Sequence, residues 1–144
     1  MIRHIAGIAE IVDDMEAAIS FYRDVLGLMV RHEQGAGYAD VEVPGILHFG
    51  IWLRKRAAEI TFGDPGVADR IPLGFTIGFE VDAVDALSKA MKASGGAVVQ
   101  EPQNEPWGQR TSRFLSPSGA LCELAETPEA RRITQNVQAQ PEAR

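Results

Sequence analysis

Hydrophobic and polar positions alternate in short blocks along the first half of this chain, and these blocks predict strands around one helix. The strand-like blocks are residues 4–12, 28–34, 38–43 and 46–54. Apolar residues recur at helical spacing from residue 15 to residue 26, which predicts an amphipathic helix after the first strand. Asp13 is placed to cap that helix, and Gly27 is placed to end it.

The same pattern starts again in the second half. Residues 75–81 alternate as a strand, and Asp82 is placed to cap a helix that continues to about Ser94, before Gly95-Gly96. The remaining strand-like blocks are residues 97–100, 110–115 and 120–125. The second half therefore repeats the strand and helix order of the first.

One constant separation relates the two halves. Val12-Asp13, Gly27 and Val30 each have a counterpart 69 residues later, at Val81-Asp82, Gly96 and Val99. Each match falls at the boundary of a predicted element, which favours a tandem repeat of two βαβββ modules. We expect an α+β fold with one domain over residues 1–126. Its parts are module 1 (4–54), a linker (55–73) whose composition suits an exposed loop or excursion, and module 2 (74–126). A flexible C-terminal tail (127–144) follows.

Composition narrows the class of protein. A chain of 144 residues suits one compact domain. A net charge of -6 argues against a partner that is nucleic acid, because such binders need a basic face. No apolar run is long enough to span a membrane, and we expect no signal peptide before the first strand. The single cysteine, Cys122, excludes an internal disulfide, so the expected location is the cytoplasm.

Two stretches carry a resemblance to a known family. The helix sequence VDDMEAAISFYRDVLGL of residues 12–28 resembles the first helix of the vicinal oxygen chelate superfamily. The sequence RFLSPSGALCEL of residues 113–124 is similar to its closing hairpin. This superfamily includes glyoxalase I, bleomycin-resistance proteins and extradiol dioxygenases. The resemblance covers residues 4–126 and implies a cupped, half-open, mixed sheet of eight strands around a cavity, usually in a dimer. It does not imply one reaction.

Metal-dependent members of that superfamily carry four His or Glu ligands at symmetric positions of the two modules. The resemblance places these positions at Gly7, Thr76 and Glu123, with one more in residues 46–54, where His48 is the only candidate ligand. Two ligands of four are too few for a firm site. We therefore predict no tightly bound catalytic metal and no other cofactor, although a weakly bound divalent metal remains compatible with His48 and Glu123.

Strand alternation places His48 and Glu123 on the same side of the sheet. Leu47, Phe49, Ile51 and Leu53 form one apolar face of their strand, which leaves His48 on the other face. Glu123 is likewise opposite the apolar face of its own strand. If the apolar faces pack on the helices, both polar groups point into the cavity as its catalytic pair, whereas a register shift of one residue would turn His48 outward. A buried Glu123 needs a partner, which could be a ligand, His48, Arg110 or water.

Four further residues are predicted to bind the substrate: Trp52, Thr76, Trp107 and Arg110. Trp52 shares the face of His48, and Thr76 is the repeat counterpart of Gly7. The segment from Trp107 to Arg110 resembles one beside the pocket mouth of bleomycin-resistance proteins. The two tryptophans and Arg110 also have a structural interpretation, because tryptophans often anchor cores or interfaces and an arginine often pairs with a surface carboxylate.

These features favour a small-molecule-binding protein with an incomplete metal site. It would sequester a planar hydrophobic compound, or act on it without a metal through His48 and Glu123. The alternative is a metal-dependent lyase, isomerase or dioxygenase that completes its ligand shell from elsewhere. A third hypothesis is an interaction module with a vestigial cavity. A homodimer is expected because the half-open sheet has edges and apolar rims to cover.

Overall fold

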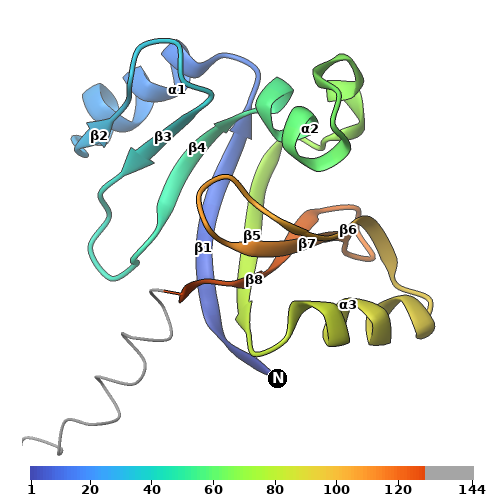
Figure 1. Ribbon diagram of the computed structural model, residues 1–144. Helices are drawn as coiled ribbons and strands as arrows, with labels where there is room; N and C mark the ends of the chain where they lie inside the picture. The colour runs from blue at the N-terminus through green and yellow to red at the C-terminus, as the bar shows by residue number, and fades with distance from the viewer. Residues whose placement is uncertain (129–144) are drawn as a thin grey trace, which may run out of the picture.

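The computed structural model describes residues 1–128 as one eight-stranded mixed sheet with helices on both faces (Figure 1). The strands are β1 (Ile2–Val12), β2 (Val30–Arg31), β3 (Tyr38–Val41), β4 (Phe49–Leu53), β5 (Gly74–Val81), β6 (Ala97–Asn104), β7 (Arg110–Leu115) and β8 (Leu121–Glu126). The helices are α1 (Met15–Ser20) with a π-helical continuation η1 (Phe21–Val25), α2 (Arg54–Phe62), the 3₁₀ helix η2 (Pro65–Arg70) and α3 (Val84–Ala93). This architecture confirms the predicted α+β class.

The sheet order confirms the predicted repeat. The strands run β2-β3-β4-β1-β5-β8-β7-β6, so each module contributes four neighbouring strands. β1 and β5 meet antiparallel at the centre, where Ile8 pairs with Ile77. Each of them pairs in parallel with the last strand of its own module, β4 or β8. The two residues of the central pair are 69 positions apart, so the separation found in the sequence describes a local two-fold relation between the modules.

One face of the sheet, here called the outer face, is covered by α1 and α3. Met15 and Ile19 of α1 pack against Ile51 of β4, while Val84 of α3 packs against Leu124 of β8. The apolar faces of the closing strands therefore pack on the helices, as alternation predicts.

The capping residues of both helices differ from the prediction by one position. Asp14, not Asp13, caps α1, and its carboxylate accepts from the N–H of Ala17 at 3.0 Å. At α3 the N-cap is Ala83, and the N–H of Val84 donates to Glu126 at 2.7 Å. A side chain from the end of β8 therefore stabilises the start of this helix, which a local sequence pattern does not reveal.

The linker is where the structure differs most from the sequence prediction. The composition of residues 55–73 predicts an exposed loop, but the segment contains α2 and η2. Ala57, Ala58 and Ile71 are fully buried and pack against Ile11 and Leu121. Two adjacent alanines allow the helix to approach the strands closely, so α2 covers one end of the second face of the sheet, here called the inner face.

The predicted tail begins with an anchored residue. Thr127 donates from its N–H and its hydroxyl to the buried carboxylate of Glu80, at 2.6 and 2.8 Å. The rest of the predicted flexible tail, residues 129–144, lies outside the described residues. Across residues 1–128, no helix is long and apolar enough to cross a membrane.

Candidate functional site

A row of residues crosses the middle of the inner face. In the strand ladders Gly7 lies opposite Gly78, Gly78 opposite Glu123, and Glu123 opposite Arg113. His48 lies at the other end of the row, where its Cβ would be 3.1 Å from a Cβ built on Gly7. The row therefore has a polar group at each end and two glycines between them.

The two glycines at the centre of the sheet are approached by the side chains at the two ends of the row, since a Cβ on Gly7 would lie 3.1 Å from Cβ of His48. A Cβ on Gly78 would lie 3.6 Å from Oε1 of Glu123, so the carboxylate extends over this position. Glycine within a strand often marks a place where a ligand approaches the backbone closely. The middle of the inner face between His48 and Glu123 is therefore lined by residues without a side chain.

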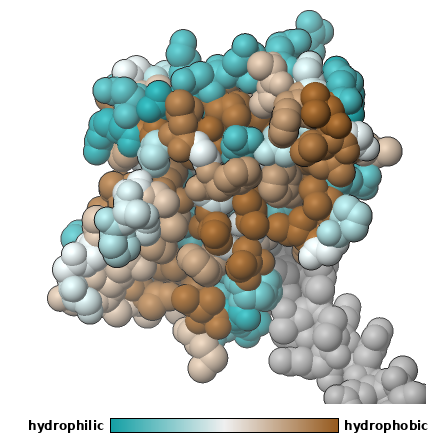
Figure 2. All heavy atoms as spheres, turned by 180° about the vertical axis from the view of Figure 1, so that it is seen from behind, coloured by the Kyte–Doolittle hydropathy of each residue, from teal (hydrophilic) through white to brown (hydrophobic). Residues whose placement is uncertain are grey.

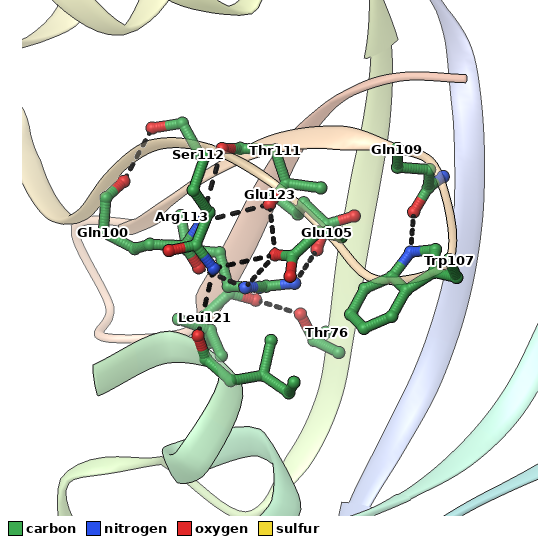
Figure 3. A network of polar contacts seen from close by, with 12 residues as sticks. Thr76, Gln100, Glu105, Trp107, Gln109, Thr111, Ser112, Arg113, Leu121 and Glu123 are labelled. Carbon is green, nitrogen blue, oxygen red and sulfur yellow. Dashed lines mark hydrogen bonds and ion pairs between the residues drawn. The ribbon is translucent and has the colours of Figure 1, made fainter. Parts of the chain in front are cut away.

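Arg113 holds Glu123 in place (Figure 3). Its Nη2 lies 2.7 Å from Oε2 of Glu123, and its Nη1 lies 3.1 Å from Oε1 of Glu105 and also contacts Gln100. Thr111 donates to Glu105 at 2.6 Å and accepts from Gln100 at 3.0 Å. A single buried guanidinium therefore organises two carboxylates and an amide.

The two ends of this ion pair differ in exposure. The side chain of Arg113 is 1% exposed, whereas that of Glu123 is 19% exposed. Burial raises the pKa of Glu123, and this effect is opposed by the charge and hydrogen bond of Arg113 and reinforced by Glu105 and Glu80. A carboxyl group with a raised pKa that remains accessible is suited to exchange protons with a bound molecule.

Trp52 and Thr76 both lie on the inner face. The guanidinium of Arg113 lies 5.2 Å from the ring centroid of Trp52, a cation–π contact that joins the two modules. The hydroxyl of Thr76 donates to the carbonyl of Leu121 at 2.6 Å. Trp52 therefore offers its ring as a wall of the site, while the Thr76 hydroxyl is engaged by the backbone.

The other two predicted binding residues, Arg110 and Trp107, form hydrogen bonds with other side chains. Arg110 forms a bidentate pair with Asp85 at the start of α3, with both distances 2.6 Å, so its side chain is on the outer face. Trp107 lies in the β6–β7 turn, is 50% exposed, and donates from its indole N–H to Gln109 at 2.7 Å. Neither residue contacts Glu123, and the predicted partner Arg110 is replaced by Arg113.

His48 and Glu123 share the row but do not bind each other. Among residues 1–128 no hydrogen bond or ion pair joins them, and the side chain of His48 is exposed at the rim. The structure thus places the two predicted catalytic groups on one face, where Gly7 and Gly78 separate them and they are not in contact.

The residues at the four symmetric positions do not fit a metal site. Ile8 pairs with Phe49 and its repeat counterpart Ile77 pairs with Cys122, so the counterpart of Glu123 is Gly50 and not His48. The other two positions are Gly7 and Thr76, which leaves Glu123 as the one strong donor. Its carboxylate is already bound by a guanidinium, whose positive charge disfavours a cation there. In the described part of the chain no group of three ligating side chains converges.

The sequence prediction missed Arg113, although a signal for it exists. The turn at Pro117-Ser118-Gly119 predicts an antiparallel hairpin, and counting back from it places residue 113 opposite residue 123. An arginine and a glutamate on the same face of adjacent strands are expected to pair. Counting the register outward from the turn would therefore have identified the partner of Glu123.

Residues 2–124 match the family model described as Glyoxalase/Bleomycin resistance protein/Dioxygenase superfamily. The chain belongs to this superfamily. The match covers the whole sheet up to β8, including the row from His48 to Arg113. It confirms the relation that the helix at residues 12–28 suggested.

Solved structures of the superfamily share the fold. Methylmalonyl-CoA epimerase from Mycobacterium tuberculosis is 22% identical, with a TM-score of 0.61 over 91% of this chain and 93% of that one. A superfamily member from Vibrio splendidus 12B01 is 17% identical, with a TM-score of 0.56 over 88% and 100%. A Streptomyces coelicolor methylmalonyl-CoA epimerase variant in complex with 2-nitronate-propionyl-CoA is 19% identical, with a TM-score of 0.59 over 89% and 96%. No curated protein sequence matches this chain.

Proposed function

We propose that this protein binds a small organic molecule on the inner face and that it functions without a tightly bound catalytic metal. The observation that carries the proposal is Glu123, an accessible carboxylate with a raised pKa that is fixed by a buried arginine over two glycines. In this proposal Glu123 is the main polar contact and acid–base group, and His48 is the second polar group at the rim.

The surroundings of Glu123 favour a planar, largely apolar ligand. The Trp52 ring borders the site and is itself oriented by Arg113, while Gly7 and Gly78 add no side chain between His48 and Glu123. Sequestration of a compound and acid–base chemistry on it both require that the compound binds at this site. One binding experiment therefore tests both functions.

The test is a thermal-shift screen of planar aromatic compounds, antibiotic-like compounds and methylmalonyl-CoA, which is bound in one solved structure of a methylmalonyl-CoA epimerase with this fold. A ligand at about one hundred times its Kd stabilises the folded state by about 2.7 kcal/mol. We expect Glu123→Gln to weaken binding of a stabilising compound by about ten-fold or more, because a hydrogen bond to a charged acceptor is lost. His48→Ala should have a smaller effect, since His48 is exposed.

Glu42→Gln is the matched control, because Glu42 is an exposed carboxylate that forms only a 3.4 Å surface pair with Arg31. Equal affinity of wild-type and Glu123→Gln protein would contradict the placement of the ligand.

Metal analysis of protein purified without chelator is a separate experiment. A stoichiometric transition metal whose occupancy falls in Glu123→Gln and His48→Ala would instead support a metal-dependent enzyme.

We also propose that the protein is a homodimer. Ile5 of β1, Phe21 of η1 and Phe75 of β5 are about half exposed, at 51%, 48% and 57%. Figure 2 shows apolar side chains gathered across one face of the molecule. Contiguous exposed apolar surface favours association. Light scattering at micromolar concentration is expected to give twice the monomer mass, and a monomer there would refute the proposal.

A further inference from the structure

Tyr38 reaches over the position that corresponds to Glu123 in the first module. Tyr38 pairs with Trp52 in the β3–β4 ladder, so its side chain starts on the inner face. A Cβ on Gly50 would lie 2.7 Å from Cε2 of the Tyr38 ring and nearer still to its hydroxyl. Since Gly50 is the structural counterpart of Glu123, the Tyr38 hydroxyl occupies the space that a second carboxylate would fill.

The Tyr38 hydroxyl is without a hydrogen-bond partner in the described part of the chain. Tyr38 is 39% exposed, and within residues 1–128 its hydroxyl forms no hydrogen bond with another group. Burial raises the pKa of Tyr38 to about 12, with further contributions from the charges of Asp40 and Glu123. The phenol therefore stays protonated at neutral pH as a hydrogen-bond donor, and it lies near enough to Glu123 to respond to its charge.

Donor and acceptor thus face the same surface from the two modules. Tyr38 presents an O–H group, and Glu123 presents a carboxylate that Arg113 holds in a fixed orientation. A ligand that satisfies both groups needs an acceptor oxygen on one side and a proton donor on the other. Trp52 lies beside Tyr38 in the ladder and adds an aromatic surface.

We propose that Tyr38 is a ligand-binding residue of the inner face, which donates a hydrogen bond to a carbonyl oxygen of a planar ligand whose hydroxyl group donates to Glu123. The ligand class is a hydroxyaryl ketone or a compound with the same pair of groups. This inference rests on the proposed function, because it names the chemistry of the ligand at the same site.

The placement of Tyr38 can be tested without a ligand, because the chain has only two tyrosines. Tyr22 is 5% exposed and its hydroxyl donates to Glu10 at 2.6 Å, so it serves as an internal control. In protein labelled with 3-fluorotyrosine, Glu123→Gln and Gly50→Ala should each move the ¹⁹F resonance of Tyr38 and leave that of Tyr22 in place. A Tyr38 resonance that responds to neither substitution would overturn the inference.

Gly78→Ala is the matched control for Gly50→Ala. Both variants add one methyl group to the inner face, but at Gly78 the nearest neighbour is Glu123 at 3.6 Å, which is an ordinary contact. We therefore expect the Tyr38 resonance to move less in Gly78→Ala than in Gly50→Ala. Equal shifts would show that Tyr38 does not fill the space over Gly50, and would also overturn the inference.

The ligand class is tested with 2-, 3- and 4-hydroxyacetophenone and their methoxy analogues, which keep the carbonyl but lose the donor. At least one hydroxy isomer should bind, move the Tyr38 resonance, and bind Tyr38→Phe roughly ten-fold more weakly. Its methoxy analogue should bind more weakly to the wild-type protein. The hydroxyl of Tyr38 has no partner in the described chain, so Tyr38→Phe is expected to fold normally.

The outcomes separate this inference from the proposed function. If screened compounds bind wild-type and Tyr38→Phe protein equally, or if hydroxyacetophenones do not bind while other compounds do, the inference is wrong and the proposed function stands. If no compound of any class stabilises the wild-type protein, the proposed function fails and the inference fails with it.

Discussion

Arg113→Leu is expected to destabilise the protein by about 3–5 kcal/mol at pH 7, because it leaves buried carboxylates without their cation. Arg113 is 1% exposed and contacts Glu123 and Glu105, and the Glu105 side chain is also 1% exposed. Chemical denaturation monitored by circular dichroism measures the loss. Arg31→Leu is the matched control, since Arg31 forms an exposed pair with Glu42 and should change stability by less than about 1 kcal/mol.

The destabilisation in Arg113→Leu should shrink as the pH falls. The pKa of Glu123 is higher in the folded state than its value of 4.5 in the unfolded state. When the pH is above the folded-state pKa, the charged Glu123 therefore destabilises the folded state to its full extent. As the pH falls through the folded pKa toward 4.5, the folded state takes up a proton first and the penalty is relieved. Removal of Arg113 removes the interaction that lowers the Glu123 pKa, so this effect should be larger in the variant than in wild type.

A second substitution, Glu123→Gln in the Arg113→Leu background, should recover part of the lost stability by removing one unpaired charge. Equal stability of Arg113→Leu and wild type at pH 7, or a loss that stays constant as the pH is lowered from 7 toward 4.5, would contradict the account of a buried network centred on Arg113.

Ala57→Asp is expected to destabilise the protein by several kcal/mol, because it places an unpaired charge at a fully buried position of α2. Ala57 packs in the same cluster as Ile11, Ile71 and Leu121, and these apolar neighbours offer no cation to an introduced carboxylate. Thermal denaturation should show a large fall in Tm or a protein that does not fold.

Lys55→Asp is the matched control for this prediction. Residue 55 is exposed in the first turn of the same helix, where the helix dipole favours a negative charge. Lys55→Asp changes the net charge of the protein by more than Ala57→Asp does. We expect little change in stability. Similar Tm values for Ala57→Asp and wild type would mean that residues 54–62 do not pack on the inner face, as an exposed linker would predict.

The local pattern of the sequence sufficed for much of the fold. The alternation of apolar residues in 75–81 and the helical spacing in 15–26 predicted elements that the structure contains. The recurrence of boundaries after 69 residues predicted the module repeat, because both copies must bury the same kind of face. Alternation also placed Glu123 opposite the apolar face of β8, since neighbouring side chains in a strand point to opposite sides.

Other features depended on contacts between distant segments. The carboxylate of Glu126 caps α3 from 42 positions away, and α2 is helical over a segment whose composition suited a loop. Charged residues surround the two alanines of α2 in the sequence, and these alanines become buried only because β1 and β8 provide a surface for them. Local propensity does not contain this information, because tertiary packing supplies most of the stability of a short helix.

For the site, the sequence by itself determined which residue types are available, and it identified Glu123 as the retained polar group and Gly7 and Thr76 as positions without a strong metal donor. Only the tertiary structure decided that Arg113 also binds Glu105 and Gln100, and that Gly50 is the counterpart of Glu123. The physical reason is that alternation fixes the face of a side chain but not its neighbours. Those neighbours depend on the pairing of strands that are distant in the sequence, which the alternation within one strand does not determine.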